Sequence, residues 1–233
     1  MPSVLLWTPE SDNDREAVLC IAQKVVKFYG CELKVSSGTK QGFSTAAQKP
    51  GGLKKAVDIY LKSNDLVIFL IDADGIRSQA QRRKEKNSLI NRIQPVVQAS
   101  GGKALLILML QELEAWLLVD CLGICCYFTE NPNTRSNEEW IKFAKDKQVG
   151  QTDLIEEAEL GGKNAKEYLI ELSKEILIKK NPNLKNKPRN LEERQYSGSK
   201  SAKVAEYMEI SSQTLGRNKS LKEFAQGLQK LAK

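Results

Sequence analysis

Acidic residues stand directly after three apolar segments of this 233-residue sequence. The clearest case is LVIFLI, residues 66–71, which runs into Asp72 and Asp74. Residues i and i+2 of an extended chain point to the same side, so these two carboxylates are expected to lie close together. Two ionised carboxylates repel each other at short range, and a divalent cation that prefers oxygen ligands relieves the repulsion. The D-x-D spacing therefore indicates a site for Mg²⁺ or Mn²⁺.

Two further acidic clusters follow the apolar segments at 3–7 and 104–110. These clusters contain Glu10, Asp12, Asp14, Glu112 and Glu114. Each has a structural alternative, because the spacing of Ser11 and Asp14 matches a helix capping box, and an acid after a strand often starts a turn or a helix. Three such clusters at the ends of successive strands nevertheless favour a shared metal site.

The spacing of apolar residues predicts alternating strands and helices up to about residue 125. Strands are expected at 3–7, 31–37, 66–72 and 103–110, and helices at 14–29, 53–63, 77–100 and 112–123. The Gly- and Ser-rich segment 36–52 is expected to be a loop, and the third helix is expected to break near Pro95. This alternation predicts a parallel sheet of four strands with helices on both faces. Because ligands bind at the carboxyl ends of such strands, the acidic clusters should meet at one edge.

Helices alone are expected after residue 125. Their predicted ranges are 138–146, 151–158, 164–180, 200–210 and 219–231, the last with an apolar stripe of Leu221, Phe224, Leu228 and Leu231. The chain is therefore expected to divide into an α/β domain, residues 1–125, and a helical, basic region, residues 126–233. Trp116 is expected in the core, and base stacking is the alternative for it and for Trp140.

The net charge of +7 is concentrated in one segment. Residues 174–203 contain nine Lys or Arg and three Glu, a balance of +6. Such a segment favours a polyanionic partner, and a solvated loop that keeps the protein in solution is the alternative. The candidates for contacts with the phosphates of nucleic acid are Lys40, Arg77, Arg82, Arg83, Lys179, Lys180, Lys185, Lys187, Lys200 and Lys203.

The absence of some residue types and motifs limits the catalytic mechanisms and ligand sites that this chain can have. The sequence has no histidine, which excludes Ser-His-Asp triads, histidine general bases and histidine-ligated zinc. Its five cysteines match no zinc spacing and are expected to be reduced and buried. No P-loop motif is present, so any ATP site would belong to another subunit. No apolar run reaches the roughly 20 residues of a membrane span and no signal peptide is recognisable, so a cytoplasmic protein without membrane contact is expected.

Several segments resemble the TOPRIM domain of topoisomerases, primases and OLD-family nucleases. ESDNDREAVLCIA is similar to that family's first turn and helix, with Glu10 as its glutamate and Asp14 as its second acid, and LIDADG matches its D-x-D element. QELEAWLLVD resembles the E-A-W-L-L-A-D signature of a TOPRIM-like family often encoded beside an ABC- or SMC-type ATPase in bacterial defence loci. The C-terminus, from YSGSKSAKVAEYMEI to SLKEFAQGLQKL, is similar to that family's helical end. Ser11 stands where the family usually has glycine, and this leaves open which of Glu10, Asp12 and Asp14 is the key first acid.

The resemblance implies a TOPRIM-like (Rossmann-like) fold with a helical C-terminal extension and the activity of a metal-dependent nuclease. It implies that Asp72 and Asp74 hold Mg²⁺ or Mn²⁺, that Glu114 with Glu112 or Asp120 contributes to a second ion, and that Glu10 is a general acid–base or a ligand. The implied metal ligands are Glu10, Asp14, Asp72, Asp74, Glu112 and Glu114, and the implied catalytic residues are Glu10, Asp72, Asp74 and Glu114. The implied partners are nucleic acid and a separate ATPase subunit of an anti-phage defence system, and a homodimer is left open. The alternative is a non-catalytic module that keeps the fold and binds nucleic acid or the ATPase.

Overall fold

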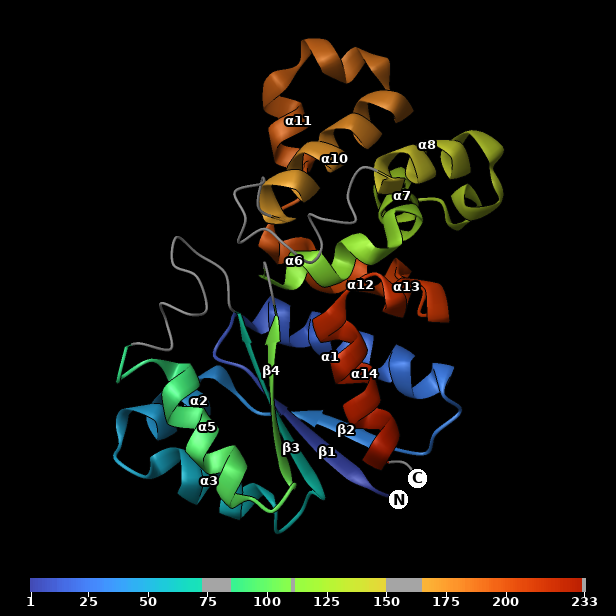
Figure 1. Ribbon diagram of the computed structural model, residues 1–233. Coiled ribbons are helices and arrows are strands. Elements are labelled where there is room, and N and C mark those ends of the chain that lie inside the picture. Colours follow the sequence, from blue (N-terminus) through green and yellow to red (C-terminus); the bar gives the residue numbers. More distant parts are fainter. Residues whose placement is uncertain (73–84, 110–111, 150–164, 232–233) are drawn as a thin grey trace.

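Figure 1 shows a computed structural model of the chain, which describes residues 1–72, 85–109, 112–149 and 165–231. Its centre is a sheet of parallel strands in the order β2-β1-β3-β4. The strands are β1 (Ser3–Trp7), β2 (Lys34–Ser37), β3 (Leu66–Asp72) and β4 (Ala104–Met109). The predicted α/β architecture with a four-stranded parallel sheet is confirmed, and β1 and β3 have the predicted bounds.

Helices cover both faces of the sheet (Figure 1). Alternate side chains of a strand point to opposite faces, so each strand contributes to two cores. Leu6 and Ile68 belong to the core formed with α1 (Asp12–Phe28) and α14 (Lys219–Leu231). Trp7 and Phe69 belong to the other core, which three helices complete. These are α2 (Lys40–Gln48), α3 (Gly52–Tyr60) and α5 (Leu89–Ala99).

Helix α2 lies in a segment that was predicted to be a loop. Thr39 caps it, because the Thr39 hydroxyl accepts a hydrogen bond from the Gly42 amide at 3.0 Å. Phe43 and Ala47, one turn apart, are buried, and the Phe43 ring packs edge-on against Trp7 with centroids 5.1 Å apart. The helix is therefore stabilised by tertiary packing, which outweighs the unfavourable Gly and Ser content of the segment.

Helix α5 continues through Pro95, where a break was predicted. A proline inside a helix removes one backbone hydrogen bond. Ser88 caps the helix by accepting a hydrogen bond from the Asn91 amide. The side chains of Ile90 and Ile93, on the inner face of the helix, are buried. Capping and burial together hold a helix that the proline alone would weaken.

Helices follow β4 through the rest of the described chain. They are α6 (Glu112–Leu117), α7 (Cys121–Thr129), α8 (Glu138–Val149), α10 (Ala165–Lys180), α11 (Pro188–Arg194), α12 (Ser201–Tyr207), α13 (Ser212–Gly216) and α14, with 3₁₀ turns at Leu118–Asp120, Pro132–Ser136, Pro182–Asn186 and Gly198–Lys200. The last helices return to the sheet, where α12 packs on α1 and α14 packs on β4. The predicted helix at 151–158 lies outside the described residues. The predicted division of the chain at residue 125 stays a prediction.

Trp116 lies in the core, as predicted. It is fully buried, its indole N–H donates to Ser220 at 2.8 Å, and its ring stacks on Phe224 of α14. The predicted stripe of α14 is confirmed, with Leu221 and Leu228 buried beside Phe224. The last helix is thereby joined to α6, which directly follows the sheet.

Two further sequence predictions concern cysteines and membranes. All five cysteines are free thiols, and Cys121, Cys125 and Cys126 are buried, while Cys20 and Cys31 are partly exposed. No helix within the described ranges is long and apolar enough to cross a membrane.

Candidate functional site

The connections of the sheet reverse direction between the neighbouring strands β1 and β3. The chain leaves β1 through α1 to reach β2 on one side, and it leaves β3 toward β4 on the other side. Ligands of open α/β sheets bind at such a reversal of strand order. The last pair between β1 and β3 is Trp7 with Phe69, whereas β3 pairs with β4 as far as Asp72 and Met109. β3 therefore extends three residues beyond its last pair with β1. Asp72 therefore ends β3 beyond the level at which β1 ends.

The first acidic cluster divides into residues with different surroundings. The Ser11 hydroxyl donates to Asp14 Oδ2 at 2.6 Å and accepts from the Asp14 amide at 3.2 Å, so this pair caps α1. Asp12 has a largely exposed side chain and pairs with Arg15 at 3.5 Å on the helix surface. The Glu10 amide donates to the buried Thr8 hydroxyl at 3.2 Å, which fixes the turn after β1. Asp14 therefore caps α1, whereas Asp12 lies on its exposed surface.

Glu114 is a buried carboxyl at the start of α6, with only 4% of its surface exposed. Its Oε1 accepts a hydrogen bond from the hydroxyl of Tyr196 at 3.0 Å. Burial raises the pKa of Glu114, and the negative charge of Asp14 raises it further, while the Tyr196 hydrogen bond and the charge of Lys166 oppose the shift. Asp14, which follows β1, is thus close enough to Glu114, which follows β4, for its charge to affect the pKa of Glu114.

The hydroxyl of Tyr196 joins Glu114 to a short chain of hydrogen bonds. It lies 2.8 Å from the Ser201 hydroxyl, which donates to the carbonyl of Gly198 at 2.8 Å. These contacts connect Glu114 of α6 with Ser201, the first residue of α12.

Glu112 has a left-handed backbone with φ of 66°. This conformation is unfavourable for a residue other than glycine by about 1–3 kcal/mol, and such strain is often found at functional sites. Lys166, at the start of α10, places its ammonium 4.0 Å from the Glu112 carboxylate. Glu112 and Glu114 are therefore both within the electrostatic reach of one lysine.

Other predicted site residues lie outside the described part of the chain. They are Asp74, Arg77, Arg82 and Arg83. The proposed sharing of an ion by Asp72 and Asp74 is therefore still a prediction. Within the described ranges, no three Asp, Glu or Cys side chains come close enough together to form a metal cage.

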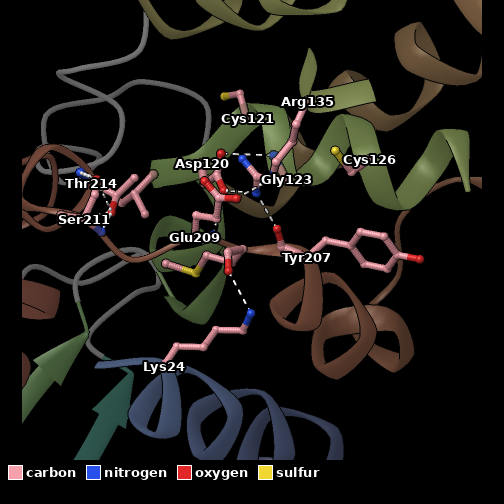
Figure 2. A network of polar contacts seen from close by, with 12 residues as sticks. Lys24, Asp120, Cys121, Gly123, Cys126, Arg135, Tyr207, Glu209, Ser211 and Thr214 are labelled. Carbon is pink, nitrogen blue, oxygen red and sulfur yellow. Dashed lines mark hydrogen bonds and ion pairs between the residues drawn. The ribbon is translucent and has the colours of Figure 1, made fainter. Parts of the chain in front are cut away.

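Asp120, considered for a second ion, belongs to a different network (Figure 2). Its Oδ1 accepts from the Gly123 amide at 3.0 Å and caps α7, and its Oδ2 accepts from Arg135 at 2.6 Å and from the Glu209 amide at 2.8 Å. Arg135 also pairs with the Glu209 carboxylate at 3.0 Å. The Asp120 carboxylate is thus used to tie α7 to the segment after α12.

The predicted phosphate-binding residues occupy separate surfaces. Lys40, Lys185, Lys187 and Lys203 are exposed, and α11 lies in the part of the molecule away from the sheet (Figure 1). Lys179 lies over the Trp140 ring at 5.2 Å, and Lys180 pairs with Glu130 at 3.2 Å. Lys200 donates to the carbonyls of residues 193–195 at the end of α11, and burial lowers its pKa. Lys200 therefore contributes hydrogen bonds to the end of α11. Its contact with nucleic acid stays a prediction.

Sequence reasoning missed Tyr196, Ser201 and Lys166. These residues lie far from Glu112 and Glu114 along the chain, and neither their spacing nor their neighbours indicate a contact with α6. A polar cluster made by distant segments leaves no periodic signal in one sequence. Tyr196 stands in the apolar-poor segment RQYSGSK, where an isolated buried tyrosine is the single hint.

Comparison of the chain with models of protein families, with curated proteins and with solved structures gives no match. The resemblance to TOPRIM domains therefore rests on the sequence motifs alone.

Proposed function

We propose that this chain is a TOPRIM-type, divalent-metal-dependent phosphodiesterase that hydrolyses nucleic acid. The observation that carries the proposal is the position of acids at the carboxyl ends of the neighbouring strands β1, β3 and β4, where Asp14 follows β1, Asp72 ends β3 and Glu114 follows β4. Parallel strands bring their carboxyl ends to one edge of the sheet, so we expect these carboxylates to lie along that edge. Acids concentrated in this way repel one another, and a bound cation relieves the repulsion.

The residues at this edge fit a hard divalent cation. They offer carboxylate oxygens, which Mg²⁺ and Mn²⁺ prefer, and the chain has no histidine to favour softer metals. Mg²⁺ commonly uses one or two protein carboxylates and keeps several waters. Asp72 and Asp74 would hold the ion. When bound, such an ion polarises a phosphate and lowers the pKa of water.

The remaining acids would have separate roles in hydrolysis. Glu10, on the turn fixed by Thr8, would accept or donate a proton at this edge. Glu114, whose burial raises its pKa, is suited to hold a proton and release it to a leaving oxygen. Asp14 would contribute negative charge near Glu10 and Glu114. These roles require no histidine.

The basic segment 174–203 would contact the phosphate backbone. Lys185 is exposed on a 3₁₀ turn, Lys187 is exposed between that turn and α11, and Arg189 is exposed on α11. Such charges bind polyanions without sequence preference. We further propose that an ABC- or SMC-type ATPase in an anti-phage defence system controls the activity, because this chain carries no P-loop.

A non-catalytic binding module is the second candidate. The use of Asp14 in the cap of α1 favours it, because a capping acid needs no further role. Incubation of the purified chain with single- and double-stranded DNA and RNA separates the two. The proposal expects cleavage with Mg²⁺ or Mn²⁺ that stops on addition of a chelator, alone or with the neighbouring ATPase. Binding without cleavage under every one of these conditions supports the module instead.

A further inference from the structure

The two edges of the sheet have different compositions. The edge strand β2 carries an exposed Lys34 and two serines, Ser36 and Ser37. The opposite edge strand, β4, reads ALLILM and has no charged or polar side chain. Charged and polar residues protect an edge from pairing with another chain. β2 has this protection and β4 lacks it.

Backbone groups on the outer side of β4 have no hydrogen-bond partner among the described residues. The Lys103 carbonyl accepts from the Val67 amide at 3.0 Å, which fixes the alternation of hydrogen bonds between β3 and β4. In a parallel ladder the residues that bond to one neighbour alternate with residues that face away. Leu106 and Leu108 are the residues that face away. No hydrogen bond joins their outward groups to another residue in the described part of the chain.

A groove of about 380 Å³ runs between β4 and α14. Its apolar lining includes Leu105, Ile107 and Leu231. Glu223 and Lys230, both exposed on α14, border the groove and form no ion pair with a described residue. The apolar groove thus has one acid and one base beside it, and neither charge is paired by a residue in the described part of the chain.

We infer that β4 and this groove are the interface for a second copy of the chain, with the two β4 strands antiparallel about a two-fold axis. Such an axis, perpendicular to the sheet, joins two four-stranded sheets into one and brings the α14 helices to the same face. Paired strands lie about 4.8 Å apart and packed helices about 8–10 Å apart. The two β4 strands can therefore pair while the two α14 helices pack against each other. The outward groups of Leu106 and Leu108 gain partners, and the two grooves merge.

The charges of Glu223 and Lys230 favour a second copy of the chain as the binding partner at the groove. Helix α14 runs opposite to β4, so Glu223 lies toward the carboxyl end of the strand and Lys230 toward its start (Figure 1). The two-fold axis places Glu223 next to Lys230 of the partner subunit, and the same pair forms again on the other side. An extended peptide of another protein could use the strand edge, but it has no need of this charge pattern.

Sedimentation velocity of the full chain over a range of micromolar concentrations tests the inference. The wild type should form dimers, and Glu223→Lys or Lys230→Glu alone should weaken association about tenfold, because two attractions become two repulsions. The double variant Glu223→Lys, Lys230→Glu should regain association, and so should an equal mixture of the two single variants. Lys222→Glu, an exposed change on the same helix away from the groove, is the matched control and should associate like the wild type.

Either of two results would overturn the inference. One is a wild type that stays monomeric throughout the micromolar range. The other is a dimer that the single variants weaken without any recovery in the double variant and in the mixture. Both positions are exposed, so circular dichroism should show the same fold in all the variants.

Discussion

Replacing Tyr196 by phenylalanine tests the environment of Glu114. The change keeps the buried ring and removes the hydroxyl that bonds to Glu114 Oε1 at 3.0 Å and lies 2.8 Å from Ser201. A hydrogen bond to an ionised group contributes about 1.5–3 kcal/mol to stability, and one between neutral groups about 0.5–1.5 kcal/mol. We therefore expect the loss in the free energy of unfolding to be about 1 kcal/mol larger where Glu114 is ionised than where it is protonated.

The direction of the pH dependence follows from the pKa of Glu114. Its pKa in the folded protein is raised above the ordinary 4.5 by burial, so the folded state keeps a proton that the unfolded state releases. The contribution of Glu114 to stability is therefore fully present below its unfolded pKa and is lost as the pH rises through the folded pKa. Because the Tyr196 hydrogen bond lowers the folded pKa, Tyr196→Phe should raise it further and extend this loss to higher pH.

Urea unfolding of metal-free protein between about pH 4 and pH 8 measures this difference. Tyr60→Phe is the matched control, because the Tyr60 ring packs on Trp7 and its hydroxyl makes no hydrogen bond with the described residues. The control should lose little stability and show no added pH dependence. An equal loss for Tyr196→Phe at both ends of the pH range would refute the link between the hydroxyl and the charge of Glu114.

Three further predictions concern the metal, the basic segment and the α7 network. Mg²⁺ or Mn²⁺ should raise the melting temperature of the wild type, and Asp72→Ala or Asp74→Ala should remove most of that rise, since a ligand that binds only the folded state stabilises it; an unchanged rise in both variants would place the ion elsewhere. Neutralising Lys179, Lys180, Lys185 and Lys187 together should flatten the salt dependence of nucleic-acid binding by about 0.7–0.9 in log–log slope for each lost contact; the wild-type slope in that variant would assign the charges to another role. Gly123→Ala should destabilise the chain by about 1–3 kcal/mol, because a Cβ there would lie 2.7 Å from Asp120 Oδ2 and 2.8 Å from the Tyr207 carbonyl. Gly216→Ala, with open space around the new methyl group, is its control in thermal unfolding, and equal melting temperatures would contradict the expected crowding.

The sheet could be predicted because its signals are local. LVIFLID and SVLLW are nearly continuous apolar runs that end at turn residues, and both strands have the predicted bounds. Helix α2 could not be predicted in the same way, because its stability depends on the contact between Phe43 and Trp7, two residues from separate elements. Local composition therefore favoured a loop at a place where tertiary packing forms a helix.

The candidate site shows the same limit. The acids after β1, β3 and β4 could be identified, because parallel strands bring their carboxyl ends to one edge. Their protein partners could not be identified. The hydroxyl of Tyr196 reaches Glu114 from 82 positions further along the chain, and Asp120 is taken up by Arg135 and by the Glu209 amide. Such contacts depend on how the helices after β4 fold back, which one sequence does not reveal.

The central claim is metal-dependent hydrolysis at the carboxyl edge of the sheet, and cleavage of labelled nucleic acid by Glu10→Gln and Glu114→Gln tests it most directly. Glutamine keeps the size of the side chain and removes its ability to exchange a proton. We predict that each variant loses cleavage by a factor on the order of 10²–10⁴ while binding to nucleic acid stays near the wild-type level. Glu16→Gln, an exposed change on α1, is the control and should cleave normally. Full cleavage by both Glu10→Gln and Glu114→Gln, beside an active wild type, would contradict the assignment of this edge as the active site.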